Sequence, residues 1–94
     1  MQIFVTPRAE KNFDTIAAYI KENFGENTTK LFIKKVDEIF TLLSNYPQMG
    51  QTEYNDIRGF QLSPQTKLLY RIRNNKIIIL TFFDVRQNPK KKYK

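Results

Sequence analysis

The chain has 94 residues, of which 40% are hydrophobic and 14% aromatic, enough for one domain with a modest core. It has no cysteine and no histidine. This excludes disulfides and thiolate chemistry, and it removes the commonest metal ligand and general base near neutral pH. We therefore expect neither a metal site nor a cofactor.

Positive charge is concentrated in the last third of the chain. Residues 57–94 carry ten basic side chains against one acid, Asp84, for a net charge of +9, whereas residues 1–56 carry six against eight acids, for −2; the sum is +7. A field this one-sided attracts a polyanion, either a nucleic acid or an acidic protein. The simpler alternative is a solvated surface with a basic tail.

The chain shows no signal for export or membrane insertion. Residues 1–5 lack the charged start and long apolar run of a signal peptide. The longest wholly apolar run, residues 77–80, is far too short to span a bilayer. We expect a cytoplasmic protein with no membrane partner.

The N-terminal part is expected to form a strand and then a helix. Residues 2–6 favour extended backbone, and Pro7 ends this strand. In residues 8–24 the apolar side chains recur at steps of three and four, which predicts one apolar face of an α-helix. Gly25 is expected to cap the C-terminus of this helix.

A second helix with the same period is expected next. Asn27 or Thr28 is predicted to cap its N-terminus. The helix should end near Tyr46, because Pro47 disfavours helical backbone in the residue before it. The link between the two helices is so short that they should pack antiparallel as a hairpin.

After an expected loop at residues 47–55, the apolar period changes to that of strands. Strands are predicted at residues 57–62, 66–73 and 76–83, separated by turns at 63–65 and 74–75. In the middle strand, Leu68, Tyr70 and Ile72 should face the core. The other face of that strand carries Lys67, Leu69, Arg71 and Arg73.

The last strand, residues 76–83, is apolar almost throughout, so it should be central and covered on much of both faces. The element order is β-α-α-β-β-β. The simplest packing is an α+β fold with the helical hairpin on one face of a mostly antiparallel, four-stranded sheet. Residues 1–94 then form a single domain in which 84–94 are a basic C-terminal tail.

Five sequence stretches occur in an informative order and spacing. They are I-A-A-Y-I at 16–20, L-L-S-N-Y-P-Q-M-G at 42–50, I-R at 57–58, K-L-L-Y-R-I at 67–72 and F-F-D-V-R-Q-N-P at 82–89. Together they make nearly the whole chain resemble the RelE/ParE family of bacterial type II toxins. The resemblance implies a toxin with a cognate acidic antitoxin, whose partly disordered segment orders on the toxin surface.

The resemblance leaves two activities open. RelE-like members resemble ribonucleases that cut messenger RNA on the ribosome, which requires a base, an acid and cations that stabilise the phosphate. ParE-like members resemble inhibitors of DNA gyrase, which need no bond-cleaving chemistry. The positions that match the RelE catalytic pattern are Arg58, Lys67, Arg86 and Tyr93.

The RelE match is incomplete. The second lysine of that pattern falls near Phe60 or Gln61 and is missing, and no general base is evident, since arginine stays protonated. The long hairpin and the R-Q-N-P ending at 86–89 favour the ParE-like, plasmid-stabilisation branch, so the chain need not be an enzyme. The residues expected to bind the target are Arg58, Lys67, Arg71, Arg73, Arg86 and Lys90.

We expect the candidate cations to gather along one C-terminal edge of the sheet, with Arg86 the most important. Asp84 is interpreted as a structural partner of Arg86 or Arg71, and Arg58 has the simpler alternative of pairing with Asp56. A third possibility is a non-toxic nucleic-acid-binding module. That module would need exposed aromatics between the cations, whereas its candidates are expected in the core: Phe60, Tyr70, Phe82 and Phe83.

Overall fold

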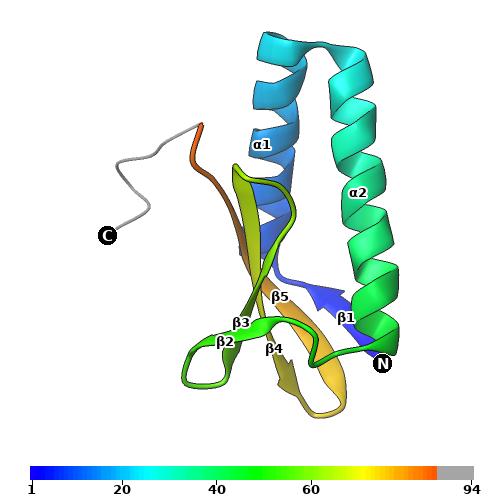
Figure 1. Cartoon of the computed structure of the whole chain (residues 1–94), viewed down its shortest axis with the longest axis vertical. Helices are drawn as coiled ribbons and strands as arrows, with labels where there is room; N and C mark the ends of the chain where they lie inside the picture. Colours follow the sequence, from blue (N-terminus) through cyan, green and yellow to red (C-terminus); the bar gives the residue numbers. More distant parts are fainter. Residues whose placement is uncertain (87–94) are drawn as a thin grey trace.

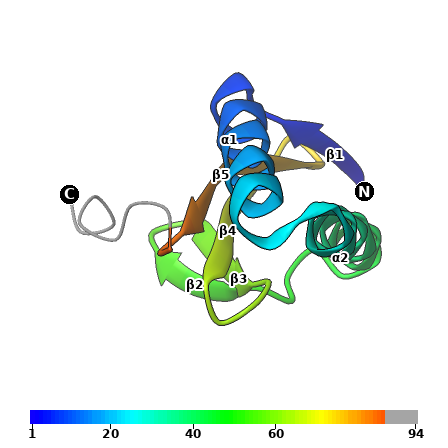
Figure 2. The same cartoon turned by 90° about the horizontal axis from the view of Figure 1, so that it is seen from above.

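The structure is a computed structural model and describes residues 1–86. Its elements in chain order are β1 (Gln2–Val5), α1 (Pro7–Phe24), α2 (Glu26–Asn45), β2 (Gln51–Tyr54), β3 (Ile57–Gln61), β4 (Thr66–Arg73) and β5 (Lys76–Asp84). Figures 1 and 2 show both helices on the same side of the sheet, which confirms the α+β class. Neither helix is apolar enough over a sufficient length to cross a bilayer.

The sheet has five strands in the order β1-β5-β4-β3-β2. Strand β1 pairs parallel with β5, and the other neighbours are antiparallel, as the mostly antiparallel prediction required. The prediction of four strands was wrong, because residues 51–54 form an edge strand rather than a loop. All four residues of β2 are exposed, so this strand has no buried face and no apolar alternation that a sequence could display.

Helix α1 begins where a threonine and a proline together favour a helix start. The Thr6 hydroxyl accepts a 3.1 Å hydrogen bond from the backbone N–H of Ala9, and Pro7 occupies the first helical turn. Gly25 ends the helix as predicted, with a positive φ of 91° that glycine adopts without strain.

Helix α2 starts directly after Gly25, so the predicted caps at Asn27 or Thr28 were wrong. Gly25 serves as the C-terminal cap of α1 and the N-terminal cap of α2. Its carbonyl oxygen accepts a 2.9 Å hydrogen bond from the Thr29 hydroxyl inside the first turn of α2. A single residue therefore reverses the chain, and the predicted helical hairpin is confirmed.

The core lies between the helical hairpin and one face of the sheet. Tyr70 and Leu68 of β4 are fully buried, as predicted, in one core cluster with side chains of α1 and α2. Strand β5 is interior, between β1 and β4. Its outward side chains Ile78 and Phe83 are partly buried, which agrees with the prediction of a central strand covered on much of both faces.

We call the sheet surface that faces away from the helices the open face. Its members from β4 are the residues that alternate with the buried ones, namely Lys67, Leu69, Arg71 and Arg73. The register places Gly59 of β3 opposite Leu69, and Ile78 of β5 opposite Arg71, on this same surface. Phe4 of β1 pairs with Ile78 and is 52% exposed, which marks the far side of the open face.

Candidate functional site

Lys67 on the open face is paired with an acid from the edge strand. Its Nζ lies 2.6 Å from Glu53 Oε2, and each side chain is 31% exposed. Glu53 belongs to β2 at a bulge, because the register with β3 shifts between Thr52 and Tyr54. A bulge re-aims the side chain of the extra residue, and here that side chain reaches across β3 to β4.

Arg71 and Arg73 share a second acid from the turn between β2 and β3. Arg73 donates from Nε and Nη2 to Asp56 Oδ2, at 3.0 and 2.7 Å. Arg71 Nη2 lies 3.3 Å from Asp56 Oδ1, and the buried Nε of Arg71 has no hydrogen-bond partner among residues 1–86. The Arg73 hydrogen bond, aided by the Arg71 charge, lowers the pKa of Asp56.

Arg58 lies on the opposite face, beside the segment that follows α2. It pairs in register with Tyr70 of β4. Its Nη1 donates to the carbonyl oxygens of Gln48 and Gly50, at 3.1 and 2.8 Å. The suggested pair of Arg58 with Asp56 was therefore wrong, since Asp56 is held by Arg71 and Arg73 instead.

Tyr70 also binds the segment that follows α2, through its hydroxyl group. Its hydroxyl donates to the Pro47 carbonyl oxygen at 2.8 Å and accepts from the Gly50 N–H at 2.9 Å. Burial raises the pKa of Tyr70, with the Gly50 N–H and the Arg58 charge acting in the opposite direction. Arg58 and Tyr70 thus hold the link between α2 and the sheet in one conformation.

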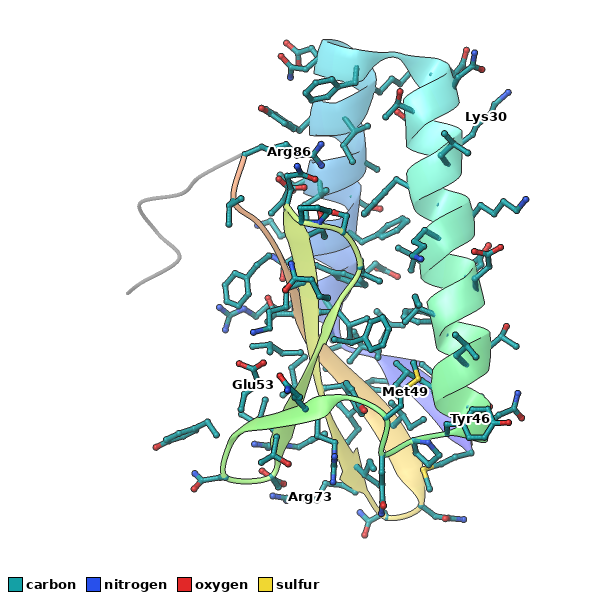
Figure 3. The ribbon with its side chains drawn as sticks, viewed as in Figure 1. Lys30, Tyr46, Met49, Glu53, Arg73 and Arg86 are labelled. Atoms are coloured by element: carbon teal, nitrogen blue, oxygen red, sulfur yellow. The ribbon has the colours of Figure 1, made fainter. Side chains whose placement is uncertain are left out.

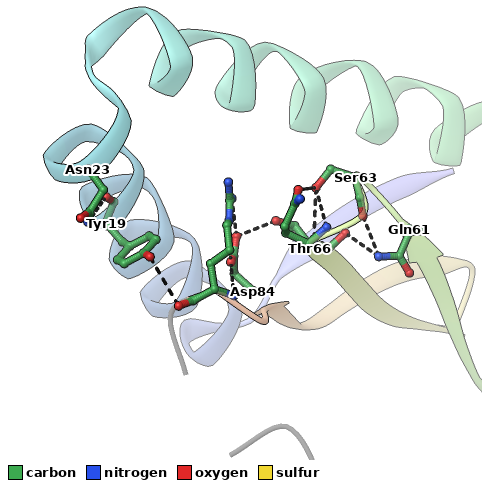
Figure 4. Close-up of polar contacts among 8 residues, drawn as sticks. Tyr19, Asn23, Gln61, Ser63, Thr66 and Asp84 are labelled. Carbon is green, nitrogen blue, oxygen red and sulfur yellow. Dashed lines mark hydrogen bonds and ion pairs between the residues drawn. The ribbon is translucent and has the colours of Figure 1, made fainter. Parts of the chain in front are cut away.

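Arg86 is bound at the end of β5 by the acid two residues before it. Its Nε and Nη2 donate to Asp84 Oδ1 and Oδ2, at 3.0 and 2.7 Å, which confirms the predicted partnership. The Thr66 hydroxyl also donates to Asp84 Oδ2, at 2.7 Å (Figure 4). Burial alone would raise the pKa of Asp84, but the hydrogen bonds from Arg86 and Thr66 outweigh it and lower that pKa.

The Arg86 side chain also contacts the tip of the helical hairpin. Its guanidinium carbon lies 5.3 Å from the centre of the Phe24 ring, within the range of a cation–π interaction. The Tyr19 hydroxyl donates to the Arg86 carbonyl oxygen at 3.4 Å. Arg86 therefore joins the end of the sheet to the end of α1.

A groove of about 290 Å³ lies beside Arg86, between the helical hairpin and the β3–β4 turn. Its walls are mainly apolar, and its cations are Lys35 and Arg86. Leu31 at its rim is 68% exposed. The residues that line it are Ile20, Thr28, Leu31, Phe32, Lys35, Leu62, Ser63, Gln65, Thr66 and Arg86.

The structure thus divides the candidate cations between two faces, and the expectation of a single cationic edge was wrong. Lys67, Arg71 and Arg73 lie on the open face, whereas Arg58 and Arg86 contact elements on the helix side. Figure 3 places Arg86 beside α1 and Arg73 at the far end of the sheet. The predicted site residues Lys90 and Tyr93 lie outside the described residues.

Sequence reasoning missed the acids that pair with the open-face cations. Glu53 was assigned to a loop and given no role, and Asp56 was considered only for Arg58. The available signal was the position of these two acids in the C-terminal half, one strand ahead of the basic strand at 66–73. Among residues 1–86 no group of three acids, histidines or cysteines could hold a metal ion.

This chain is similar to known toxins in sequence and in fold. A model of the ParE toxin of the type II toxin–antitoxin system parDE matches residues 3–89. No curated protein sequence gives a significant match. Among solved structures, a chain of the chromosomal ParDE TA system from P. aeruginosa is 18% identical with a TM-score of 0.74, over 89% of this chain and 95% of that one.

Two further structures have the same fold. The YoeB dimer from Staphylococcus aureus is 16% identical with a TM-score of 0.62, over 88% of this chain and 94% of that one. A chain of the E. coli DinJ–YafQ complex is 12% identical with a TM-score of 0.59, over 93% of this chain and 96% of that one.

These likenesses define the class as the small α+β toxins of the RelE/ParE type. Because the family model spans nearly the whole chain, this protein belongs to the ParE toxin family of type II toxin–antitoxin systems.

Proposed function

We propose that this protein arrests bacterial growth in the cytoplasm by binding and inhibiting DNA gyrase, as expected of a ParE-like toxin. The observation that weighs against catalysis is the state of its cations. Lys67 is the one lysine among the residues that match the RelE catalytic pattern, and its ammonium group forms an ion pair with Glu53. Arg58 and Arg86 are engaged with backbone carbonyls and with Asp84, and an arginine cannot act as a base at neutral pH.

Ribosome-dependent cleavage of messenger RNA is the alternative activity. The likeness to the YoeB and YafQ structures supports it only at the level of the fold, because both identities are below one fifth. A RelE-like reaction would need a proton acceptor within reach of the RNA 2′-hydroxyl. The cations of residues 1–86 could stabilise the charge on a phosphate. They do not provide the proton acceptor that the reaction needs.

The proposed partner is a cognate acidic antitoxin with apolar anchors. The groove between the helical hairpin and the β3–β4 turn suits such a segment, since Leu31 and Phe32 provide apolar contact and Lys35 and Arg86 provide positive charge. A segment that orders on binding needs both kinds of contact to offset its lost conformational entropy.

The test is inducible expression in bacteria. We expect induction alone to stop growth, with filamentation and DNA damage, and co-expression of the adjacent small gene to restore growth. Normal growth at a high soluble yield would contradict the toxin assignment. Arrested translation with messages cut at the ribosome would contradict gyrase as the target and support the RelE-like alternative.

A further inference from the structure

The hairpin formed by β2 and β3 folds two carboxylates onto the open face. We call Glu53 and Asp56 the hairpin acids, and Lys67, Arg71 and Arg73 the open-face cations. The three positive and two negative charges are joined by three ion pairs, so the group keeps a net charge of only +1. A surface that the sequence predicts to be strongly cationic is therefore largely neutralised from within the chain.

Gly59 provides the space that Glu53 needs to reach Lys67. A Cβ at position 59 would lie 2.5 Å from Glu53 Oε2 and 2.9 Å from its Cδ and Cγ. The backbone of Gly59 does not require glycine, because Gly25 is the glycine with a positive φ. Because residue 59 has no side chain, the Glu53 side chain can pass over it and form the ion pair with Lys67.

The hairpin acids hold the open-face cations only weakly. The paired side chains are between 31% and 56% exposed, and exposed ion pairs of this kind exchange readily with other anions. Arg71 makes a 3.3 Å contact with Asp56, and its Nε has no hydrogen-bond partner in the part of the chain that the structure describes. A chain of phosphates can therefore replace the two carboxylates and satisfy these cations more completely.

We propose that the β2–β3 hairpin masks the open face, so that this face binds a nucleic-acid phosphate backbone only when Glu53 and Asp56 are displaced. The partner chemistry follows from three cations, Lys67, Arg71 and Arg73, in a row on one face of a single strand, which suits the repeating charge of a phosphate backbone. The proposal goes beyond gyrase inhibition and does not depend on it. It describes how access of anions to this surface is controlled.

A charge-neutral variant gives the sharpest test. In Gly59→Ala the new methyl group pushes the flexible Glu53 side chain away from Lys67 while the net charge stays the same. Binding of a fluorescein-labelled single-stranded oligothymidine is followed by fluorescence anisotropy at several salt concentrations. We expect an affinity gain of about threefold to fivefold, and a slope of log K against log salt that is steeper by about 0.7.

Removing the hairpin acids themselves should produce a larger effect. Glu53→Gln with Asp56→Asn is expected to raise affinity about tenfold. The matched control is Asp37→Asn with Glu38→Gln on the exposed surface of α2, which changes the net charge equally and should raise affinity by about twofold or less. Gly59→Ala added to Glu53→Gln should give no further gain, because both remove the same contact.

Three outcomes would overturn the proposal. The first is unchanged affinity in Gly59→Ala and in Glu53→Gln, each shown by circular dichroism to be folded. The second is an equal gain in the α2 control. The third is tighter binding of labelled polyglutamate than of the oligothymidine, which would assign the open face to an acidic protein. Growth arrest by the unaltered protein is scored separately, so a failure here leaves the toxin assignment intact.

Discussion

The hydroxyl of Tyr70 accepts a 2.9 Å hydrogen bond from the backbone N–H of Gly50, 20 residues earlier in the chain. The same hydroxyl donates to Pro47, so one fully buried side chain satisfies two backbone groups of the segment that leaves α2. This contact sets where β2 begins. It therefore also sets where the hairpin acids meet the open-face cations.

The first prediction concerns that hydroxyl. Tyr70→Phe should lower the free energy of unfolding by about 1–3 kcal/mol, because the Gly50 N–H and the Pro47 carbonyl lose their buried partner. Urea denaturation measures the change. The control is Tyr54→Phe, whose side chain is 70% exposed and which should leave stability unchanged. Equal stability of Tyr70→Phe and the unaltered protein would show that water replaces the hydroxyl without cost.

Gly50, just before β2, and Gly59 of β3 should respond differently to alanine. At Gly50 a Cβ would lie 2.7 Å from the Tyr70 ring and 2.9 Å from the backbone oxygen of Gly59, so Gly50→Ala should cost about 1–3 kcal/mol through overpacking. At Gly59 the three nearest atoms all belong to the movable Glu53 side chain, so Gly59→Ala should melt close to the unaltered protein. Thermal melts that rank the two variants in the reverse order would contradict this packing.

The buried carboxylate of Asp84 should make stability depend on pH. Its pKa is lowered in the folded protein, so its stabilising contribution is fully present above the ordinary aspartate pKa of about 3.9 and is lost as the pH falls through the lower folded-state value. Asp84→Asn should cost about 1–3 kcal/mol at neutral pH. This difference should shrink in acid, whereas Asp14→Asn at an exposed position of α1 should show no such convergence.

Arg86 can be tested for target binding separately from its structural role. Arg86→Ala alone leaves the Asp84 carboxylate buried without its cation, which should destabilise the fold by about 3 kcal/mol. Adding Asp84→Asn removes the uncompensated charge and should recover much of that loss. If Arg86 contacts the target, the stable double variant stays non-toxic on induction. Restored toxicity in the double variant would limit Arg86 to a structural role.

The proposed antitoxin groove predicts a variant that separates toxicity from neutralisation. Leu31→Asp places a negative charge at the rim of the groove, where Leu31 is 68% exposed. Because the side chain is already solvated, folding and growth arrest should persist, while co-expression of the adjacent gene no longer restores growth. Leu42→Asp, on the same helix outside the groove and 43% exposed, is the control and should still be rescued.

The sequence predicted the elements that bury a periodic apolar face. Both helices, the buried side of β4 and the burial of Tyr70 followed from apolar spacing alone, because packing against a core imposes that period. Strand β2 has no buried face, so nothing in its composition marked it as a strand. It forms because its backbone pairs with β3, an interaction that leaves no trace in side-chain pattern.

The sequence predicted which cations belong to the candidate site, but it did not predict how most of them pair with acids. The cations were identified from their residue types, and the pairing of Asp84 with Arg86 followed from their proximity in sequence. The pairs of Glu53 with Lys67 and of Asp56 with Arg73 depend on a bulge and on the register of three strands. Charge counting cannot reveal such pairs, and it therefore overstated the free positive charge of the sheet.

Inhibition of gyrase by binding can be measured with purified components. The protein, freed from its antitoxin, is added to DNA gyrase, ATP and relaxed plasmid, and supercoiling is followed on agarose gels. We expect supercoiling to stop in a dose-dependent manner and to resume when the antitoxin is added back. Undiminished supercoiling, together with cleavage of messenger RNA in a purified translation reaction, would contradict gyrase inhibition.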